Sequence, residues 1–160
     1  MNKIKPKKHL GQHFLVSKNV IEKIVEEIAV SPNDIIVEIG PGTGALTEEI
    51  LVKNPKILYG IEIDQTIYPV LEEKFKDYKN FKLIKSDFFN TNLYQLTSAG
   101  EKIKLVGNLP YNVASLMIVD SVFKLDILDF CVFMVQKEVA EKLIAKPKTK
   151  DYTFLSVFIQ

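Results

Sequence analysis

Short apolar runs alternate with helix-spaced segments along most of this 160-residue chain, and this alternation limits the possible folds more than any other feature. The predicted strands are residues 35–39, 57–63, 81–84, 103–106 and 130–135. Helical spacing marks the segments between and around them, namely residues 21–28 with Ser17 as a possible cap, 45–52, the apolar stripe of Ile67, Leu71 and Phe75, 114–123 and 137–145. Strands that alternate with helices predict a doubly wound α/β domain with a mainly parallel sheet, whose ligands bind at the carboxyl ends of the strands.

The composition narrows the class of protein. Apolar residues make up 47% of the chain and charged residues 26%, which is typical of one globular domain. Apolar runs are too short to cross a bilayer, and no apolar stretch follows the Lys-rich N-terminus as in a secretory signal. With one cysteine and two histidines we expect a cytoplasmic protein and no metal site.

All 21 cationic side chains are lysines, and they are unevenly distributed. One group lies in the first eight residues and another in the last quarter, the latter comprising Lys137, Lys142, Lys146, Lys148 and Lys150. Two basic ends on a chain of net charge +1 favour a nucleic-acid contact surface. A solvated tail and a solvated helix face would produce the same pattern.

The first two predicted strands end in a glycine loop and in an acid. Gly40 and Gly42 belong to a G-x-G-x-G turn, which lets a ligand approach the backbone but is also common in α/β proteins. Glu62 follows Gly40 by about 20 residues, the separation at which an acid accepts hydrogen bonds from ribose hydroxyls in related sites. The alternative is a solvated acid at a strand end.

The third strand ends at Asp87, followed by Phe88. A carboxylate there can accept a hydrogen bond from the amino group of an adenine, with the Phe88 ring beside the base. Asp87 could instead cap the helical turn that follows. Together, the three strand ends predict a pocket for a ligand that contains adenosine.

The fourth strand ends in Asn108, Leu109, Pro110 and Tyr111, the most specific feature of the chain. The side-chain carbonyl of Asn108 and the backbone carbonyl of Leu109 could accept hydrogen bonds from both N–H groups of an adenine N6. These bonds would free the lone pair of that nitrogen for attack on a methyl group. Pro110 would keep the turn rigid, and Tyr111 could stack on a base taken out of its helix. A structural turn between strand and helix is the alternative.

These motifs occur in an order that resembles the rRNA adenine N6,N6-dimethyltransferase family, in particular its small-subunit (KsgA-type) members. The matching segments are residues 10–15 (LGQHFL), 38–44 (EIGPGTG), 62–64 (EID), Asp87, 108–112 (NLPYN) and 133–140 (FMVQKEVA). The resemblance implies the Rossmann-like fold of class I S-adenosylmethionine-dependent methyltransferases, with S-adenosylmethionine as cofactor. It places His13 and Leu15 on a lid over that cofactor and Gly40 beneath it; many members carry asparagine where His13 stands.

The resemblance also implies the reaction, which is dimethylation of two adjacent adenosines in 16S rRNA of the immature small ribosomal subunit. Two alternatives stay open, a large-subunit rRNA methyltransferase of the antibiotic-resistance type and a ribosome-assembly factor whose catalysis is secondary.

Domain boundaries follow from the same comparison. Residues 1–16 are expected to form a basic arm and cofactor lid, and residues 17–160 an incomplete methyltransferase domain, truncated before its last strands and without the C-terminal helical domain. The strand at 130–135 would then be an exposed apolar edge, covered by the last residues or by a second copy of the chain.

Overall fold

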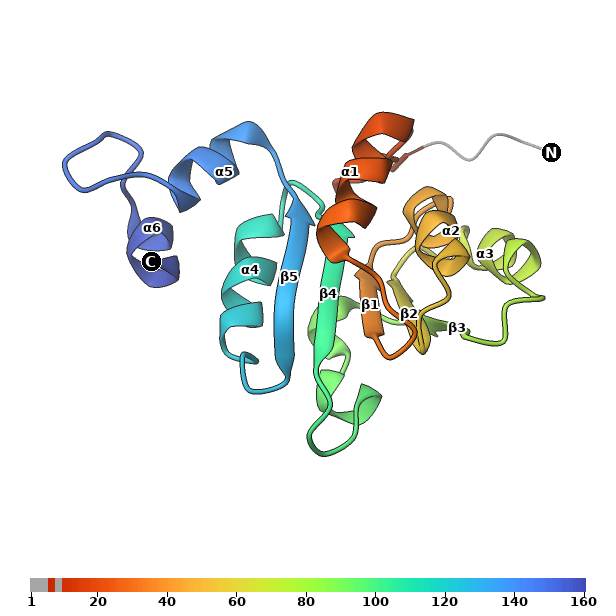
Figure 1. Ribbon diagram of the computed structural model, residues 1–160. Coiled ribbons are helices and arrows are strands. Elements are labelled where there is room, and N and C mark those ends of the chain that lie inside the picture. The colour runs from red at the N-terminus through yellow and green to blue at the C-terminus, as the bar shows by residue number, and fades with distance from the viewer. Residues whose placement is uncertain (1–5, 8–9) are drawn as a thin grey trace.

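The computed structural model describes residues 6–7 and 10–160, and its centre is a five-stranded parallel sheet (Figure 1). The strands are β1 (Ile35–Ile39), β2 (Ile57–Glu62), β3 (Phe81–Lys85), β4 (Ile103–Asn108) and β5 (Leu128–Met134). Their order is β3-β2-β1-β4-β5, and every neighbouring pair is parallel. The chain therefore reverses its direction of winding between β1 and β4, which opens a crevice at their carboxyl ends.

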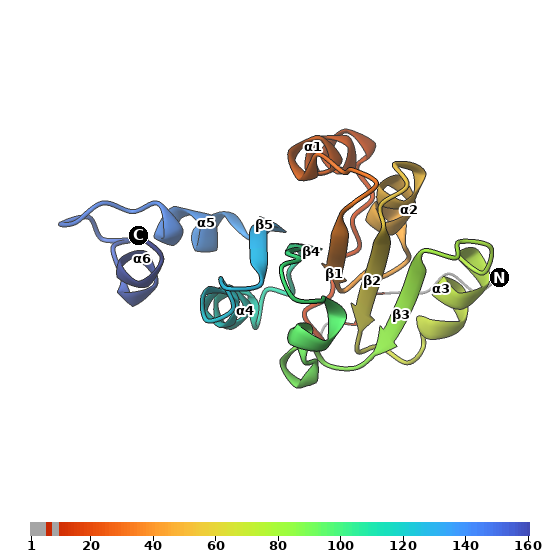
Figure 2. The same cartoon turned by 60° about the horizontal axis from the view of Figure 1, so that its bottom comes forward.

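Helices cover both faces of this sheet (Figure 2). They are α1 (Lys18–Ile28), α2 (Ala45–Val52), α3 (Tyr68–Lys74), α4 (Ala114–Val122), α5 (Lys137–Leu143) and α6 (Phe154–Ile159). One core cluster joins the sheet to α1, α2 and α3. The second joins the opposite face to α4 and to two 3₁₀ turns, Phe88–Asn90 and Leu93–Leu96. The predicted doubly wound α/β fold is confirmed.

Burial explains why these segments become strands and helices. All five residues of β1 are buried, as a central parallel strand covered on both faces requires. The predicted apolar stripe of Ile67, Leu71 and Phe75 is also buried against the sheet. No described helix has the length and apolar character needed to span a membrane.

Some local expectations differ from the structure. Ser17 stands at the N-cap position of α1 as expected, but its side chain makes no capping hydrogen bond. The last strand begins at Leu128, two residues before the predicted start, because Leu128 pairs with Ile103. It ends at Met134, one residue before the predicted end.

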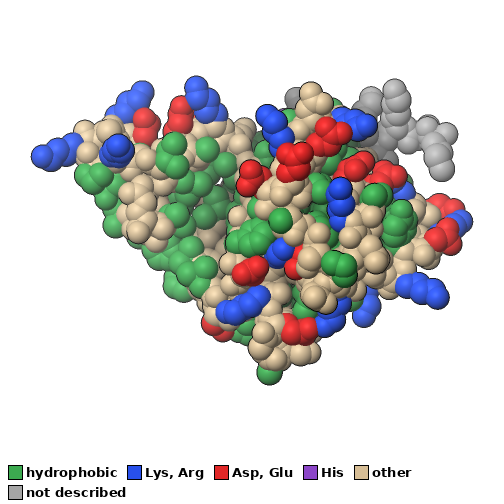
Figure 3. All heavy atoms as spheres, in the orientation of Figure 1, with side chains coloured by type: hydrophobic (Ala, Val, Ile, Leu, Met, Phe, Trp, Pro, Cys, Tyr) green, Lys and Arg blue, Asp and Glu red, His purple; other side chains and the backbone are tan. Residues whose placement is uncertain are grey.

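In the described part of the chain, β5 ends the sheet, with Asp129 and Cys131 exposed on it. The last residues form α6, which packs against α4 through rings of Phe123 and Phe158 at 5.6 Å between centroids. Thr153 caps α6 in a reciprocal capping box with Ser156. Hydrophobic side chains gather on the surface over these C-terminal helices (Figure 3). Pairing between copies of the β5 edge stays a prediction.

The two groups of lysines differ in their exposure to solvent. All five lysines of the C-terminal group are exposed, in α5 and in the loop that leads to α6. Lys3, Lys5 and Lys8 lie outside the described residues. Lys7 is half-buried, and its ammonium is ion-paired with Asp64 at 2.6 Å, so this lysine does not belong to a solvated tail.

Candidate active site

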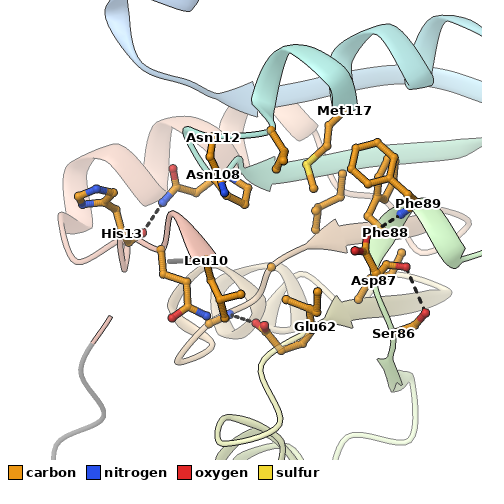
Figure 4. A pocket seen from close by; sticks show the side chains of 18 of the residues that line it. Leu10, His13, Glu62, Ser86, Asp87, Phe88, Phe89, Asn108, Asn112 and Met117 are labelled. Carbon is orange, nitrogen blue, oxygen red and sulfur yellow. Dashed lines mark hydrogen bonds between the residues drawn. The ribbon is translucent and has the colours of Figure 1, made fainter. Parts of the chain in front are cut away.

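Most of the predicted site residues meet around a cavity of about 230 Å³ at the carboxyl ends of the strands (Figure 4). Its lining includes His13, Gly40, Gly42, Glu62, Asp87, Phe88, Asn108 and Pro110. Leu15 lies beside a smaller adjoining cavity that shares His13, Gly40, Gly42 and Asn108. Side chains separated by nearly a hundred residues therefore line one crevice, as a doubly wound sheet predicts.

The glycine loop keeps the floor of the cavity open. Gly40 and Gly42 have φ angles of +65° and +55°, a conformation that side-chain-bearing residues rarely adopt. A Cβ on Gly40 would have no atom within 4 Å, so space for a ligand lies directly against the backbone. A Cβ on Gly42 would lie 3.1 Å from the ring of Phe14, which belongs to the segment above the loop.

Glu62 is buried at the end of β2, with a residue exposure of 2%. Its Oε2 accepts from the Gly42 N–H at 3.1 Å, and its Oε1 accepts from the Asp64 N–H at 2.8 Å. Burial raises the pKa of Glu62, although these hydrogen bonds oppose the rise. A carboxylate has lone pairs for further donors, so this one can still accept from a ligand. The alternative of a solvated acid is wrong, because the sheet and glycine loop enclose the side chain.

Asp87 caps the turn that follows it and also lies at the cavity. Its Oδ1 accepts from the Phe89 N–H at 2.9 Å, which caps the 3₁₀ turn Phe88–Asn90. The same residue lines the cavity, beside the buried Phe88. The cap therefore fixes the carboxylate at the cavity wall.

Asn108 connects the end of β4 to the N-terminal segment. Its Nδ2 donates to the backbone carbonyl of His13 at 2.6 Å, so Oδ1 is the acceptor end of the amide. His13 takes part in this bond through its backbone, and another residue type at position 13 could therefore preserve it. The Asn108 amide is thus held in one orientation at the cavity.

The three residues after Asn108 occupy different places. The Leu109 side chain is buried in the core, and the backbone N–H of Leu109 donates to Met134 O at 3.0 Å. Only the backbone carbonyl of Leu109 could therefore accept a hydrogen bond from a ligand. Pro110 lines the cavity. Tyr111 is 43% exposed outside the cavity lining, with its ring 5.8 Å from that of His13.

Sequence reasoning assigned no role to two buried acids near the site. Glu38, on β1, lines the smaller cavity and accepts from Thr47 Oγ1 at 2.7 Å. Asp64 contacts the N-terminal segment and the Glu62 carboxylate. Both acids lie within motifs already recognised in the sequence, but only the tertiary contacts show what each one touches. In the described residues no cluster of three His, Cys, Asp or Glu side chains could hold a metal ion.

A five-stranded parallel sheet with a cavity at its switch point is typical of Rossmann-like folds, and solved structures identify the class as methyltransferases. A dimethyladenosine transferase from Plasmodium falciparum superimposes with a TM-score of 0.78. That pair is 26% identical, and the match covers 91% of this chain and 51% of the other. The 23S rRNA methyltransferase ErmE gives a TM-score of 0.69 at 26% identity, with 88% and 52% covered.

The chain belongs to the ribosomal RNA adenine dimethylase family, whose model matches residues 3–160. It is 82% identical over its whole length to the ribosomal RNA small subunit methyltransferase A of Sulfurihydrogenibium sp. (strain YO3AOP1). The protein of that name from Persephonella marina is 63% identical, again over the whole chain. The chain spans 62% and 60% of the lengths of these two relatives. The resemblance predicted from the motifs is thereby confirmed.

Proposed function

We propose that the protein uses S-adenosylmethionine to methylate N6 of two adjacent adenosines in 16S rRNA, giving N6,N6-dimethyladenosine. Its partner would be the immature small ribosomal subunit in the cytoplasm. The observation that carries the proposal is that Asn108 lines the same cavity as Gly40, Glu62 and Asp87. The acceptor for a target amine thus lies beside the groups suited to an adenosine-containing cofactor.

The residues around the cavity fit this cofactor. Open space against Gly40 leaves room for the ligand, and Glu62 would accept hydrogen bonds from ribose hydroxyls. Asp87 would accept from the adenine amino group, with Phe88 at the ring. His13 and Leu15 would cover the ligand from the N-terminal segment. S-adenosylmethionine would supply a methyl group on a positively charged sulfur.

The corner after β4 would prepare the target nitrogen. The lone pair of an adenine amine is delocalised into the ring, which makes it a weak nucleophile. In the first transfer, Asn108 Oδ1 and the carbonyl of Leu109 would accept hydrogen bonds from its two N–H groups, favour a pyramidal nitrogen and so free the lone pair. In the second transfer the monomethylated nitrogen has one N–H left, which one of these two oxygens would accept. As the N–C bond forms, the S–C bond would break and its electron pair would remain on the sulfur as a neutral thioether. The alkylated nitrogen, now acidic, would then lose one proton to water, so attack needs no prior base. Tyr111, exposed at the rim, would stack on the extruded base.

The comparisons favour a small-subunit substrate over the large-subunit alternative. The two relatives named small subunit methyltransferases are 82% and 63% identical to this chain. The structure of the 23S rRNA methyltransferase is 26% identical. A large-subunit rRNA methyltransferase of the antibiotic-resistance type is therefore the second candidate.

The test combines cofactor binding with methyl transfer. Calorimetry with S-adenosylmethionine should show binding to the folded chain. Transfer of labelled methyl groups should favour under-methylated small subunits over large subunits and DNA. Asn108→Ala should lower the transfer rate about 100-fold, as loss of a positioned polar group at a reacting centre does. Asn33→Ala, in an exposed turn at the opposite end of the strands, is the matched control.

Three outcomes would count against this proposal. A folded wild-type chain that binds no S-adenosylmethionine would refute the cofactor assignment. Preferential labelling of large subunits would favour the antibiotic-resistance type. Normal ribosome assembly and growth in cells whose only copy carries Asn108→Ala would favour an assembly factor with secondary catalysis.

A further inference from the structure

The N-terminal segment of residues 10–15, called the lid segment below, is held against the cavity at separate points. At one point, Asn108 Nδ2 donates to His13 O. At another, Gly11 packs so closely on Asn112 that a Cβ at position 11 would lie 2.5 Å from Asn112 Oδ1. A third attachment reaches the loop after β2 and involves charged groups.

This third attachment is centred on the Asp64 carboxylate, which is 1% exposed. Its Oδ1 accepts from the Lys7 ammonium at 2.6 Å, and its Oδ2 accepts from the Gln12 amide at 3.2 Å. The Lys7 N–H donates in turn to Gln12 Oε1 at 3.0 Å, which closes the cluster. Lys7, Gln12 and Asp64 thus join both ends of one short stretch of chain to a fixed loop.

The carboxylate is ionised and fully engaged in this cluster. Burial by itself would raise the pKa of Asp64, but hydrogen bonds from Lys7, Thr66 and Gln12 outweigh it and lower the pKa to about 2. Thr66 donates to Oδ1 through both its N–H and its hydroxyl, which anchors Asp64 at the turn before α3. A buried anion held this way is a rigid point of attachment, unlike a solvated surface ion pair.

The same residue also touches the group assigned to the ribose. The Asp64 N–H donates to Glu62 Oε1 at 2.8 Å, while Gly42 holds Glu62 Oε2. Gln12 itself lines the cavity. Asp64 therefore contacts the floor of the cavity through its backbone and the lid segment through its side chain.

We infer that Asp64 is a positioning residue, and that its contacts with Lys7 and Gln12 form a latch that keeps the lid segment closed over the adenosine pocket. The inference rests on the proposed function for the identity of the ligand. The latch acts by reducing the conformational freedom that the lid segment would otherwise lose when the ligand binds. Its loss should weaken binding without unfolding the domain.

Lys7→Met is the most direct test, because Lys7 lies on the N-terminal arm. Its substitution changes neither the core nor the turn in which Thr66 donates to Asp64. Lys7→Arg keeps the charge and the donors, and should restore the latch. Lys18→Met is the matched control, since Lys18 is 81% exposed and pairs only at 3.8 Å with Glu22. Hydrogen exchange of residues 10–15 without ligand reports the latch, and calorimetry with S-adenosylmethionine reports its effect on binding.

We expect Lys7→Met to speed exchange in the lid segment and to weaken binding, each by about tenfold, as loss of one charge-assisted hydrogen bond does. Exchange in α1 should stay near that of Lys18→Met, and the melting temperature should fall only modestly below it, because Asp64 loses its cation but keeps its hydrogen bonds from Thr66 and Gln12. Unchanged exchange and affinity would overturn the latch. Faster exchange with unchanged affinity would overturn its role in binding. A wild-type chain that binds no S-adenosylmethionine would instead refute the proposed function, and the exchange rates would still decide the latch.

Discussion

Glu38 should make the stability of the domain fall as the pH rises, which few carboxylates do. The residue lies on the central strand β1, is 2% exposed, and accepts a hydrogen bond from Thr47. Burial, with a smaller contribution from the nearby Glu62 charge, raises the pKa of Glu38 from 4.5 to about 7. The folded protein therefore holds this proton over a range in which the unfolded chain releases it.

The sign and size of the effect follow from this difference. Below pH 4.5 the carboxyl group is protonated in both states, and above pH 7 it is ionised in both. Between these values the unfolded state loses its proton first, so the free energy of unfolding decreases with rising pH. The two pKa values differ by about 2.5, and at about 1.4 kcal/mol for each pH unit the loss is about 3 kcal/mol.

Glu38→Gln removes this titration while keeping the size of the side chain and an oxygen that can accept from Thr47. The stability of the variant relative to wild type should thus increase by about 3 kcal/mol between pH 4.5 and pH 8. Urea denaturation followed by circular dichroism at several pH values measures this difference. Glu27→Gln, on the exposed side of α1, controls for the loss of one negative charge.

A difference between variant and wild type that stays constant from pH 5 to pH 8 would refute this reasoning. So would a relative stability of Glu38→Gln that falls over the same range. The first result would mean that the folded protein accommodates an ionised Glu38 as readily as water does, and the second that it favours the ionised form.

Two further predictions concern the packing of the sheet. Gly107→Ala would place a Cβ 2.8 Å from the Ile39 carbonyl oxygen on β1, and should lower the free energy of unfolding by about 2–3 kcal/mol, measured by thermal denaturation. Gly60→Ala is the comparison, because its Cβ would meet side-chain atoms at 3.2 Å and should lower the free energy of unfolding by less. Equal losses of stability in the two variants would contradict the argument. Lys104→Met should cost about 3 kcal/mol at neutral pH, because the Lys104 ammonium pairs with Asp34 at 2.7 Å and donates to two carbonyls at the end of α1. Although burial alone would raise the pKa of Asp34, hydrogen bonds from Lys104 and Ser31 lower it. The stability lost in Lys104→Met should therefore shrink only as the pH falls below about 4. Urea titrations of variant and wild type at pH 3 and pH 7 would show whether it does.

The order of strands and helices could be predicted because each depends on local pattern. The run from Ile35 to Ile39 has the apolar character of a strand buried on both faces, and Ile67, Leu71 and Phe75 repeat at helical spacing. The candidate site was accessible for a related reason. A parallel sheet brings the carboxyl ends of its strands together, so Gly40, Glu62, Asp87 and Asn108 could be expected at one crevice from their positions alone.

Contacts that depend on burial or on distant partners were not accessible in this way. The sequence left open whether Asp87 caps a turn or faces a ligand, and the structure shows that its carboxylate does the first from the wall of the cavity. It likewise left Lys7 in a basic tail, whereas the ammonium reaches Asp64, 57 residues away.

Pattern along the chain thus determined all five strands, the helices before residue 153 and which residues follow each strand. The tertiary structure alone decided the electrostatic state of those residues. The pKa of Glu38 depends on how completely the surrounding layers exclude water, and that of Asp64 on donors from the N-terminal segment. Desolvation and hydrogen bonding depend on the three-dimensional surroundings of a group, and local spacing carries no information about them.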